Sequence, residues 1–528
     1  MTKEPPDHSG FETDVLIIGS GIAGAVAALQ LADSGFHVTL VTRSHKAEES
    51  NTFYAQGGIV YTAHEDSSEL LTEDILRAGA GYCNLKAVQI LAEEGPRLAR
   101  EILIEKVKVP FDRSENDELS LVREGGHSIN RIVHATDATG RAIEMALLKS
   151  LEGRANISLL TGHTAVDLLT PAHHSTDRLR IYDPLSCVGA YLLDQESGSV
   201  VRCLARKTIL ATGGIGQIYL RTTNPSGARG DGLAMANRAG ARVINSEFVQ
   251  FHPTTFYQPN APSFLISEAV RGAGAKLVDA DGTPFMEKYS PEWKDLAPRD
   301  VVSRSIHQEM LSKDITNVYL DLRSYIPKDN IKKLFPSIRE QCMLYGIDIA
   351  EELVPVVPAA HYFCGGVWVD AWGRTSVESL YAVGEVSCTG LHGANRLAST
   401  SLLEGLVWGV RAAEDIGRTV KISHDPADSE IPLWEDTGTE DADPALISQD
   451  MSVLKHIMWN YVGLVRTTRR LRRAISELRH LESETESFYR AVRPTDELVG
   501  LRNAIRTGLI VALAAWENKN SVGCHFRV

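Results

Sequence analysis

The chain has 528 residues and carries 54 Lys and Arg against 68 Asp and Glu, so its formal net charge is −14. This acidic balance argues against a general nucleic-acid binder, because phosphate backbones attract basic surfaces. With 43% hydrophobic and 23% charged residues, the composition is typical of a globular protein that buries a large core. The apolar runs are short and broken by glycine or charge, so we expect no integral membrane association.

The seven cysteines are scattered, odd in number and never spaced as Cys-x-x-Cys. This pattern disfavours a disulfide framework and a zinc ribbon, and it favours a reducing, cytoplasmic location. His173 and His174 lie in a polar segment without ligand spacing, so we assign no metal site. Residues 1–10 are polar and lack a signal-peptide pattern, so we expect a loose tail there.

Residues 14–18 form an apolar run that predicts a strand, and an Ala- and Leu-rich helix to about Asp33 follows it. Between them stands Gly19-Ser20-Gly21-Ile22-Ala23-Gly24, a pattern that lets the backbone approach a pyrophosphate at a helix N-terminus. A second strand over residues 37–42 completes a βαβ unit. It runs into Arg43 without the acidic residue of a standard NAD site, which argues against NAD.

Two later strands are predicted at 207–210 and 379–383, and each is followed by glycines. They indicate that the chain returns far downstream to the same doubly wound parallel sheet. The segment between these returns has polar loops, prolines and clustered His and Arg, which indicates an inserted lid. Near the C-terminus, an acidic linker precedes helical periodicity over 451–478 and 498–516. The predicted fold is an α/β Rossmann-like domain over 1–247 and 362–420, an inserted α+β capping domain over 248–361, a linker over 421–450 and a C-terminal helical domain over 451–528.

Five arginines of the C-terminal segment suggest a basic helix face: Arg466, Arg469, Arg470, Arg472 and Arg473. Nucleic-acid binding usually needs aromatic residues between the basic ones, or a known fold signature, and neither is present. We therefore expect an internal docking face against the acidic remainder, and no nucleic-acid partner.

Residues 50–59, with the sequence SNTFYAQGGI, are too polar and glycine-rich for a core strand. They resemble the second flavin-contacting loop of the succinate dehydrogenase and fumarate reductase flavoprotein superfamily, and are similar to the aspartate oxidases in particular. In the dehydrogenase members a histidine of this loop carries a covalent flavin bond, and the matching residue here is Asn51. The resemblance therefore implies FAD held without a covalent link.

The resemblance continues in order along nearly the whole chain. Residues 123–127 are similar to an aspartate oxidase feature whose glutamate, here Glu124, orients the amino group of the substrate. Residues 247–254 resemble the segment with a substrate histidine, here His252. Residues 266–272 look like a proton-relay strand and place Ser267 in the substrate site, with Glu268 and Arg271 at the relay positions.

The later matches concern the reacting groups. Residues 296–302 resemble the segment that bears the catalytic arginine, here Arg299. His361, Glu385 and Arg396 match a second substrate histidine, a flavin-ribose glutamate and a carboxylate-clamping arginine. The glycine motif and the resemblance together imply these FAD contacts: Gly19, Ser20, Gly21, Ile22, Ala23, Gly24, Arg43, Asn51, Thr52, Phe53, Tyr54, Ala55, Gln56, Gly57, Gly58, Thr212, Gly213, Asp231, Glu385, Ser401 and Leu402.

The chemistry of these residue types agrees with a dicarboxylate substrate, because guanidinium forks and imidazole N–H groups bind carboxylates well. Taken singly, each has a structural interpretation: a lone histidine is often a core residue, and Arg299 could pair with Asp300 or Glu268. A free guanidinium, with a pKa above about 12, is also an unusual base.

The resemblance implies that L-aspartate loses a hydride to FAD and becomes iminoaspartate, and that O₂ or fumarate takes up the electrons. That would be the first step of NAD synthesis, with the product passing to quinolinate synthase. One alternative is a soluble fumarate reductase or succinate dehydrogenase flavoprotein, against which Asn51 and Glu124 argue. A non-catalytic flavin-binding scaffold is the other, and the retained histidines and arginines argue against it.

Overall fold

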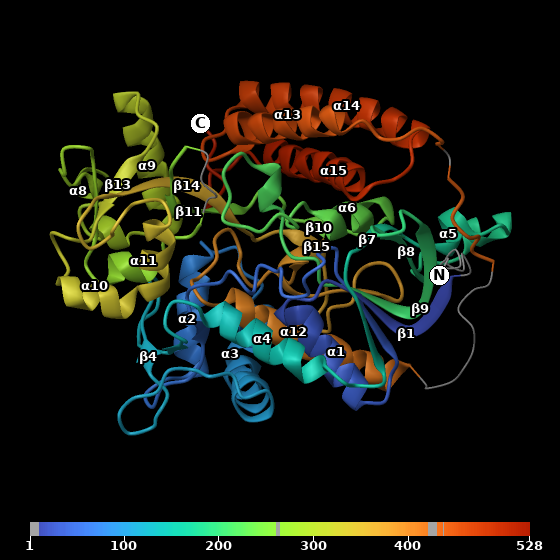
Figure 1. Cartoon of the computed structure of the whole chain (residues 1–528), viewed down its shortest axis with the longest axis horizontal. Helices are drawn as coiled ribbons and strands as arrows, with labels where there is room; N and C mark the ends of the chain where they lie inside the picture. The colour runs from blue at the N-terminus through green and yellow to red at the C-terminus, as the bar shows by residue number, and fades with distance from the viewer. Residues whose placement is uncertain (1–9, 260–263, 421–429, 437) are drawn as a thin grey trace, which may run out of the picture.

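The computed structural model describes residues 10–259, 264–420, 430–436 and 438–528. The expected N-terminal tail and part of the expected linker therefore lie outside the described residues. Figure 1 shows a central body built around a sheet, a lobe at one side with α8 to α11, and a layer of long helices above. These three parts correspond to the nucleotide-binding, capping and C-terminal helical regions expected from the sequence.

The main sheet is centred on β1 (Phe11–Ile18), which pairs in parallel with both β2 and β9. The order is β6-β2-β1-β9-β8-β7, with β16 also beside β9. The bounds are β2 (Val38–Val41), β6 (Ile157–Leu160), β7 (His163–Leu168), β8 (Gly189–Asp194), β9 (Val200–Leu210) and β16 (Leu380–Ala382). The predicted strands are present, and the downstream returns of the chain to this sheet are confirmed.

The expected doubly wound parallel sheet has one antiparallel edge. Strand β8 pairs antiparallel with both β7 and β9. The short connection from β8 to β9 allows only a hairpin, because a parallel crossover needs a dozen or more residues. Strand β9 also begins at Val200 rather than Lys207, because its first half belongs to this hairpin.

Helices and short sheets surround the main sheet. The helices are α2 (Ser68–Ala78), α3 (Leu85–Leu98), α4 (Thr139–Leu151), α5 (Pro171–His174) and α6 (Asp231–Arg238). The short strands are β3 (Ile59–Val60), β4 (Leu121–Val122), β5 (Ile132–Val133), β10 (Val243–Ile244), β15 (Gly366–Trp368) and β17 (Ser387–Cys388).

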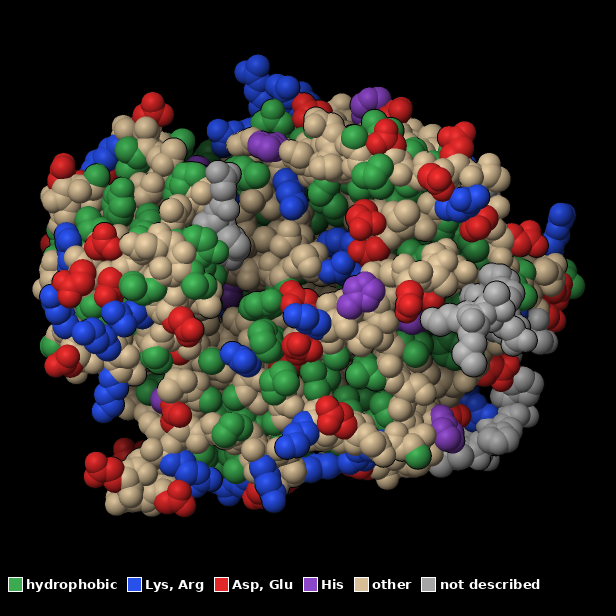
Figure 2. Space-filling model, in the orientation of Figure 1, with side chains coloured by type: hydrophobic (Ala, Val, Ile, Leu, Met, Phe, Trp, Pro, Cys, Tyr) green, Lys and Arg blue, Asp and Glu red, His purple; other side chains and the backbone are tan. Residues whose placement is uncertain are grey.

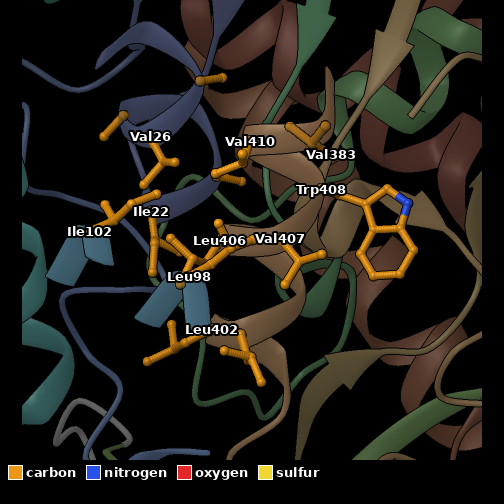
Figure 3. Close-up of a cluster of buried hydrophobic side chains, with 14 of the residues drawn as sticks. Ile22, Val26, Leu98, Ile102, Val383, Leu402, Leu406, Val407, Trp408 and Val410 are labelled. Atoms are coloured by element: carbon orange, nitrogen blue, oxygen red, sulfur yellow. The ribbon is translucent and has the colours of Figure 1, made fainter. Parts of the chain in front are cut away.

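The helix that follows the glycine turn, α1 (Ile22–Asp33), packs against α12 (Ser401–Thr419). Figure 3 shows Val26 of α1 and Leu98 of α3 directed toward the same buried cluster as Leu406 of α12. The helices approach closely because a Cβ at Gly409 would lie 2.7 Å from the carbonyl oxygen of Ala23. This packing fixes the position of the glycine turn at the start of α1.

Replacing Leu406 with Ala should lower the free energy of unfolding by about 2–5 kcal/mol, measured by chemical denaturation. Leu406 has 0% exposed surface, and the cavity left between α1 and α12 cannot close because backbone contacts already hold the helices together. Leu311→Ala is the matched control, because that leucine is 63% exposed. Equal losses in the two variants would contradict this account of the core.

The capping lobe, defined here as the elements from β11 to β14, is built on an antiparallel sheet of order β11-β14-β13-β12. Its strands are β11 (Val249–Phe256), β12 (Lys276–Val278), β13 (Val318–Asp321) and β14 (Val354–Phe363). Its helices are α7 (Glu268–Gly272), α8 (Met286–Tyr289), α9 (Arg299–Lys313), α10 (Lys328–Leu334) and α11 (Pro336–Met343). The segment expected as a relay strand is thus the helix α7, because Ser267 caps it by accepting the N–H of Ala269.

The C-terminal layer contains α13 (Pro444–Val462), α14 (Thr468–Ala491) and α15 (Asp496–Glu517). Helix α13 begins inside the predicted linker, because Asp443 caps it and Pro444 suits a first helical turn. By length and composition α15 could cross a membrane, but 72% of its most apolar window is buried inside the protein. It packs against α13, α14 and α6 and is a core helix.

The expected basic docking face is wrong for four of its five arginines. Only Arg466 is buried, and its guanidinium donates to the backbone oxygens of Glu247 and Val462. The other four, on α14, are exposed. Figure 2 shows basic and acidic side chains interspersed over the visible face of the molecule.

Candidate active site

An elongated cavity runs from the glycine turn of the main sheet to the capping lobe. It encloses about 1770 Å³ when the space open to solvent is included. Its lining joins the glycine turn to residues of the capping lobe, an arrangement that suits a dinucleotide at one end and a small substrate at the other.

The structure brings nearly all predicted site residues into this cavity. The predicted cofactor contacts that line it are Gly19, Ser20, Gly21, Ile22, Ala23, Arg43, Asn51, Thr52, Tyr54, Ala55, Gln56, Gly57, Gly58, Thr212, Gly213, Asp231, Glu385, Ser401 and Leu402. The predicted substrate and catalytic residues that line it are Glu124, His252, Ser267, Glu268, Arg299, His361 and Arg396.

Three predicted residues lie outside the lining. Gly24 has a packing role, because a Cβ there would lie 1.9 Å from the carbonyl oxygen of Gly19. The Phe53 ring packs instead under the guanidinium of Arg141, whose central carbon is 5.6 Å from the ring centre. Arg271 is buried behind Glu268, one step farther from the cavity.

The glycine turn leaves donors for an anion. Gly19 has φ +116°, a conformation that favours glycine, and it turns the chain from β1 into α1. Gly21 caps α1 without any side-chain hydrogen bond, so N–H groups of the first turn stay available. The Ile22 N–H is an exception, because it donates to Thr52 Oγ1 at 3.0 Å.

Unsatisfied polar atoms also line this end of the cavity. Asn51 Oδ1, Gln56 Oε1 and Thr212 Oγ1 are buried and have no hydrogen-bond partner among the described residues. Buried polar atoms normally find partners, so a polar ligand is expected to satisfy these. The free helix N-terminus and these atoms together fit the FAD that the sequence resemblance implies.

Glu385 and Asn51 are joined across the cavity wall. Asn51 Nδ2 donates to Glu385 Oε2 at 2.7 Å, and the Phe363 N–H donates to Oε1 at 2.9 Å. Burial raises the pKa of Glu385 to about 7. This carboxyl group can therefore accept or donate a hydrogen bond toward a ribose hydroxyl near neutral pH.

Arg396 and His361 are hydrogen-bonded to each other at the capping end. Arg396 Nη2 donates to His361 Nε2 at 3.1 Å, so His361 Nδ1 carries the proton and donates to Thr223 Oγ1 at 2.8 Å. Burial, then the charges of Arg396 and Arg299, hold the pKa of His361 well below its usual value. The imidazole is thus neutral, and Arg396 supplies the charge that a carboxylate needs.

His252 lies beside this pair, with its ring centre 5.2 Å from that of His361. Its Nδ1 lies 3.2 Å from both the N–H and the carbonyl oxygen of Thr254, and the proton is on Nε2 in the tautomer whose Nδ1 accepts that N–H. Nε2 is buried and without a partner among the described residues. Burial and the Arg299 charge hold the pKa of His252 well below its usual value, which makes it a neutral donor.

Arg299 begins α9 and reaches the cavity beside Glu268. Its Nε donates to Glu268 Oε2 at 2.6 Å, and Arg271 Nη2 lies 3.9 Å from the same oxygen. Burial would raise the pKa of Glu268, but Arg299 and Arg271 carry it below the usual value. Asp300 pairs instead with Arg304 at 2.9 Å. Arg299, Glu268 and Arg271 therefore form a chain leading from the cavity into the capping lobe.

Glu124 comes from the loop between β4 and β5, and its carboxylate lines the cavity rather than the protein surface. Ser399 donates to Glu124 Oε2 at 2.6 Å. Burial raises the pKa of Glu124, while the Ser399 hydrogen bond and the Arg299 charge oppose that rise. A carboxyl group is thus available within the cavity that holds Arg396 and both histidines.

Three residues that the sequence did not single out support this arrangement. Gln250 joins two of the arginines, because its Oε1 accepts from Arg299 at 3.3 Å and its Nε2 donates to the backbone oxygen of Arg396 at 2.9 Å. It lies two residues before His252 on one strand, and this spacing of same-face residues was a usable signal. Ser399 and Thr223 lie in loops and carry no such pattern.

Comparison with known proteins agrees with this geometry. Residues 14–402 match the model of an FAD binding domain, and residues 451–528 match the fumarate reductase flavoprotein C-terminal model. The chain is 46% identical to L-aspartate oxidase 1 of Ralstonia nicotianae, covering 97% of this chain and 94% of that one. It is 44% identical to the L-aspartate oxidase of Pseudomonas aeruginosa, covering 98% and 95%. The chloroplastic L-aspartate oxidase of Oryza sativa is 41% identical, covering 97% and 81%.

Solved structures give the same relationship at the level of the fold. The chain matches Escherichia coli quinol fumarate reductase FrdA with a TM-score of 0.88 and 27% identity, covering 98% of this chain and 92% of that one. Mycobacterium smegmatis Sdh1 matches with a TM-score of 0.81 and 28% identity, covering 98% and 89%. Because identities above 40% to both bacterial and plant relatives extend over nearly the full length of this chain, it belongs to the L-aspartate oxidase family of FAD-binding flavoproteins.

Proposed function

We propose that this protein oxidises L-aspartate to iminoaspartate with FAD as its cofactor. The observation that carries the proposal is the carboxylate of Glu124 in the same cavity as Arg396, His361 and His252. Arg396 and His252 are donors suited to the two carboxylates of the substrate, His361 holds Arg396 in place, and Glu124 is suited to the ammonium group. Bound FAD supplies the acceptor for the hydride that leaves the α-carbon.

The donors fix the substrate in one orientation. Arg396, which is held by His361 at 3.1 Å, binds one carboxylate, and His252 donates from its unpartnered Nε2 to the other. Because all three groups are buried, the hydrogen bonds to a dicarboxylate form without competition from bulk water. The substrate is thereby held with its reacting carbon facing the flavin end of the cavity.

Arg299 accepts the proton that the substrate loses. It is held by Glu268 through Nε, which leaves part of the guanidinium directed to the cavity that it lines. Glu268 and then Arg271 provide the route by which that proton leaves the site. The capping lobe, which supplies Arg299 and His252, covers the reacting atoms and excludes water.

As a member of the L-aspartate oxidase family, the enzyme carries out the first step of NAD biosynthesis. Either O₂, giving H₂O₂, or fumarate, giving succinate, removes the electrons from the reduced cofactor, and iminoaspartate passes to quinolinate synthase. We further propose a cytoplasmic location and the division into FAD-binding (1–247 and 362–420), capping (248–361), linker (421–450) and helical (451–528) regions. A soluble fumarate reductase or succinate dehydrogenase flavoprotein is the alternative enzyme, but neither activity uses a carboxylate such as Glu124 against an ammonium group.

Anaerobic mixing of the purified protein with L-aspartate tests the proposal directly. We expect the yellow flavin absorbance to bleach with L-aspartate and to persist with succinate. Bleaching with succinate alone would favour the dehydrogenase alternative. A flavin that responds to neither, while fumarate fails to reoxidise a chemically reduced sample, would favour a non-catalytic scaffold.

The FAD should be released when the protein is denatured by acid or heat. Asn51 stands where covalent flavoproteins of the superfamily have histidine, and its amide nitrogen already donates to Glu385. An amide nitrogen is not a nucleophile, so no flavin bond can form there. Absorbance of the supernatant after precipitation measures the release, and flavin that stays with the precipitated chain would contradict the prediction.

A further inference from the structure

The end of the cavity farthest from the capping lobe is bordered by α15, a helix of the C-terminal layer. Its first residue, Asp496, accepts a hydrogen bond from Arg43 Nη1 at 2.9 Å through one carboxylate oxygen. Its other oxygen accepts from Thr164 Oγ1 at 2.7 Å. Both Arg43 and Thr164 line the cavity, whereas Asp496 stands behind them.

The same carboxylate also holds a second arginine. Arg229 donates to the two Asp496 oxygens at 3.1 and 3.0 Å and to Asp231 Oδ2 at 3.0 Å. Asp231 lines the cavity, and its second oxygen accepts from Asn503 of α15 at 2.9 Å. These ion pairs form one charge network, and α15 lies on its side away from the cavity. The members of the network are Arg43, Arg229, Asp231 and Asp496.

Arg229 of this network is buried and the other three residues are partly buried, so each of its charges depends on the others. Arg229 is 7% exposed, and burial would raise the pKa of Asp496 were it not for Arg229 and Arg43, which hold it below its usual value. Removing one partner of a buried ion pair leaves the other charge without compensation. The helix is also fitted to this contact, because a Cβ at Gly500 would lie 2.3 Å from the Arg229 guanidinium.

The network stands where a dinucleotide-binding sheet receives the adenosine ribose. In such folds that ribose meets the carboxyl end of the second strand, usually at an acidic residue. Strand β2 ends at Val41, and two residues later Arg43 takes the place of the usual acidic residue. A long arginine side chain fills this role only if something fixes it. Among the described residues Arg43 contacts the carboxylate of Asp496, and it also donates to Ser226 Oγ at 3.1 Å.

We propose that Asp496, braced by Arg229, is a positioning residue of the cofactor site, which holds Arg43 in place for the adenosine half of FAD and so makes α15 part of that site. The inference rests on FAD as the occupant of the cavity. Since Asp496 acts through Arg43, its effect belongs to the adenosine half of the cofactor and leaves the flavin half unchanged.

The test compares ligands that carry one half of the cofactor. In full-length holoprotein, Asp496→Asn should weaken FAD about tenfold, measured as the FAD released at equilibrium after dilution. ADP, added as a competitor, should lose the same factor, while FMN should bind within twofold of its wild-type affinity. Glu486→Gln is the matched control, because it removes an α14–α15 ion pair, to Arg502 at 2.7 Å, that does not border the cavity. It should change none of the three affinities.

A double-mutant cycle separates positioning from general stability. Arg43→Met should give the same selective loss of ADP and FAD, and adding Asp496→Asn to it should cause little further loss. Equal losses of ADP and FMN, or additive losses in the double variant, would overturn the proposal and assign Asp496 a structural role. If Asp496→Asn does not fold, an Arg43→Met variant with unchanged ADP affinity overturns it as well. Wild-type protein that binds no FAD would instead refute the proposed function.

Discussion

Replacing Arg299 with Leu should lower the rate of aspartate oxidation by at least the ~10²-fold typical of a lost general base, while FAD stays bound. The guanidinium lines the cavity beside the substrate donors and is tied to Glu268 at 2.6 Å. Leucine fills a similar volume but can neither accept the substrate proton nor pass it to Glu268. Stopped-flow measurement of flavin bleaching by L-aspartate isolates this step from reoxidation.

Arg304→Leu is the matched control for this variant. Arg304 lies on the same helix, α9, and pairs with Asp300 at 2.9 Å without lining the cavity. The flavin of the Arg304→Leu variant should be bleached by L-aspartate at a rate within a few fold of the wild-type rate. If Arg299→Leu bleaches at a near-normal rate, another group accepts the proton. If both variants are equally slow, the loss reflects the position of α9 rather than the chemistry of Arg299.

The sequence predicted the site better than it predicted the elements that carry it. Each of the main site residues belongs to a short motif that could be recognised from the adjacent sequence. All of them line the cavity: the glycine turn, Asn51, His252, Arg299 and Arg396. Phe53 was misplaced because its whole motif was assigned to the cofactor, although its ring turns toward Arg141. A motif identifies a loop, and the direction of each side chain depends on what packs behind it.

Contacts between distant segments could not be read from the sequence. Ser399 meets Glu124 and Asp496 meets Arg43 only because the sheet and α15 bring them together. The antiparallel edge at β8 and the helix α7 were also missed, since the apolar patterns there are short and compatible with more than one element. Capping by Ser267 decides the second case, and such capping is a local signal that could have been used.

Replacing Glu124 with Gln should weaken aspartate oxidation by about 2–5 kcal/mol in kcat/KM, the cost of leaving the substrate ammonium without a buried partner. Fumarate reduction should be largely spared, because fumarate has no ammonium group. The dicarboxylate donors alone cannot distinguish aspartate from succinate, so a negative group near the α-carbon must do so. Glu124 lines the cavity beside those donors and is held by Ser399 at 2.6 Å.

The pH dependence gives a second, independent measurement of this role. Burial raises the pKa of Glu124, and only its ionised form attracts an ammonium group. In the wild type, aspartate binding should therefore strengthen as the pH rises through that pKa, and the glutamine variant should lack this dependence. Fumarate reduction should show no such difference between the two proteins. If both activities fall together, Glu124 supports the flavin loop instead, since a Cβ at Gly57 would lie 2.7 Å from its Oε1. If neither falls, the discrimination between aspartate and succinate lies elsewhere in the capping lobe.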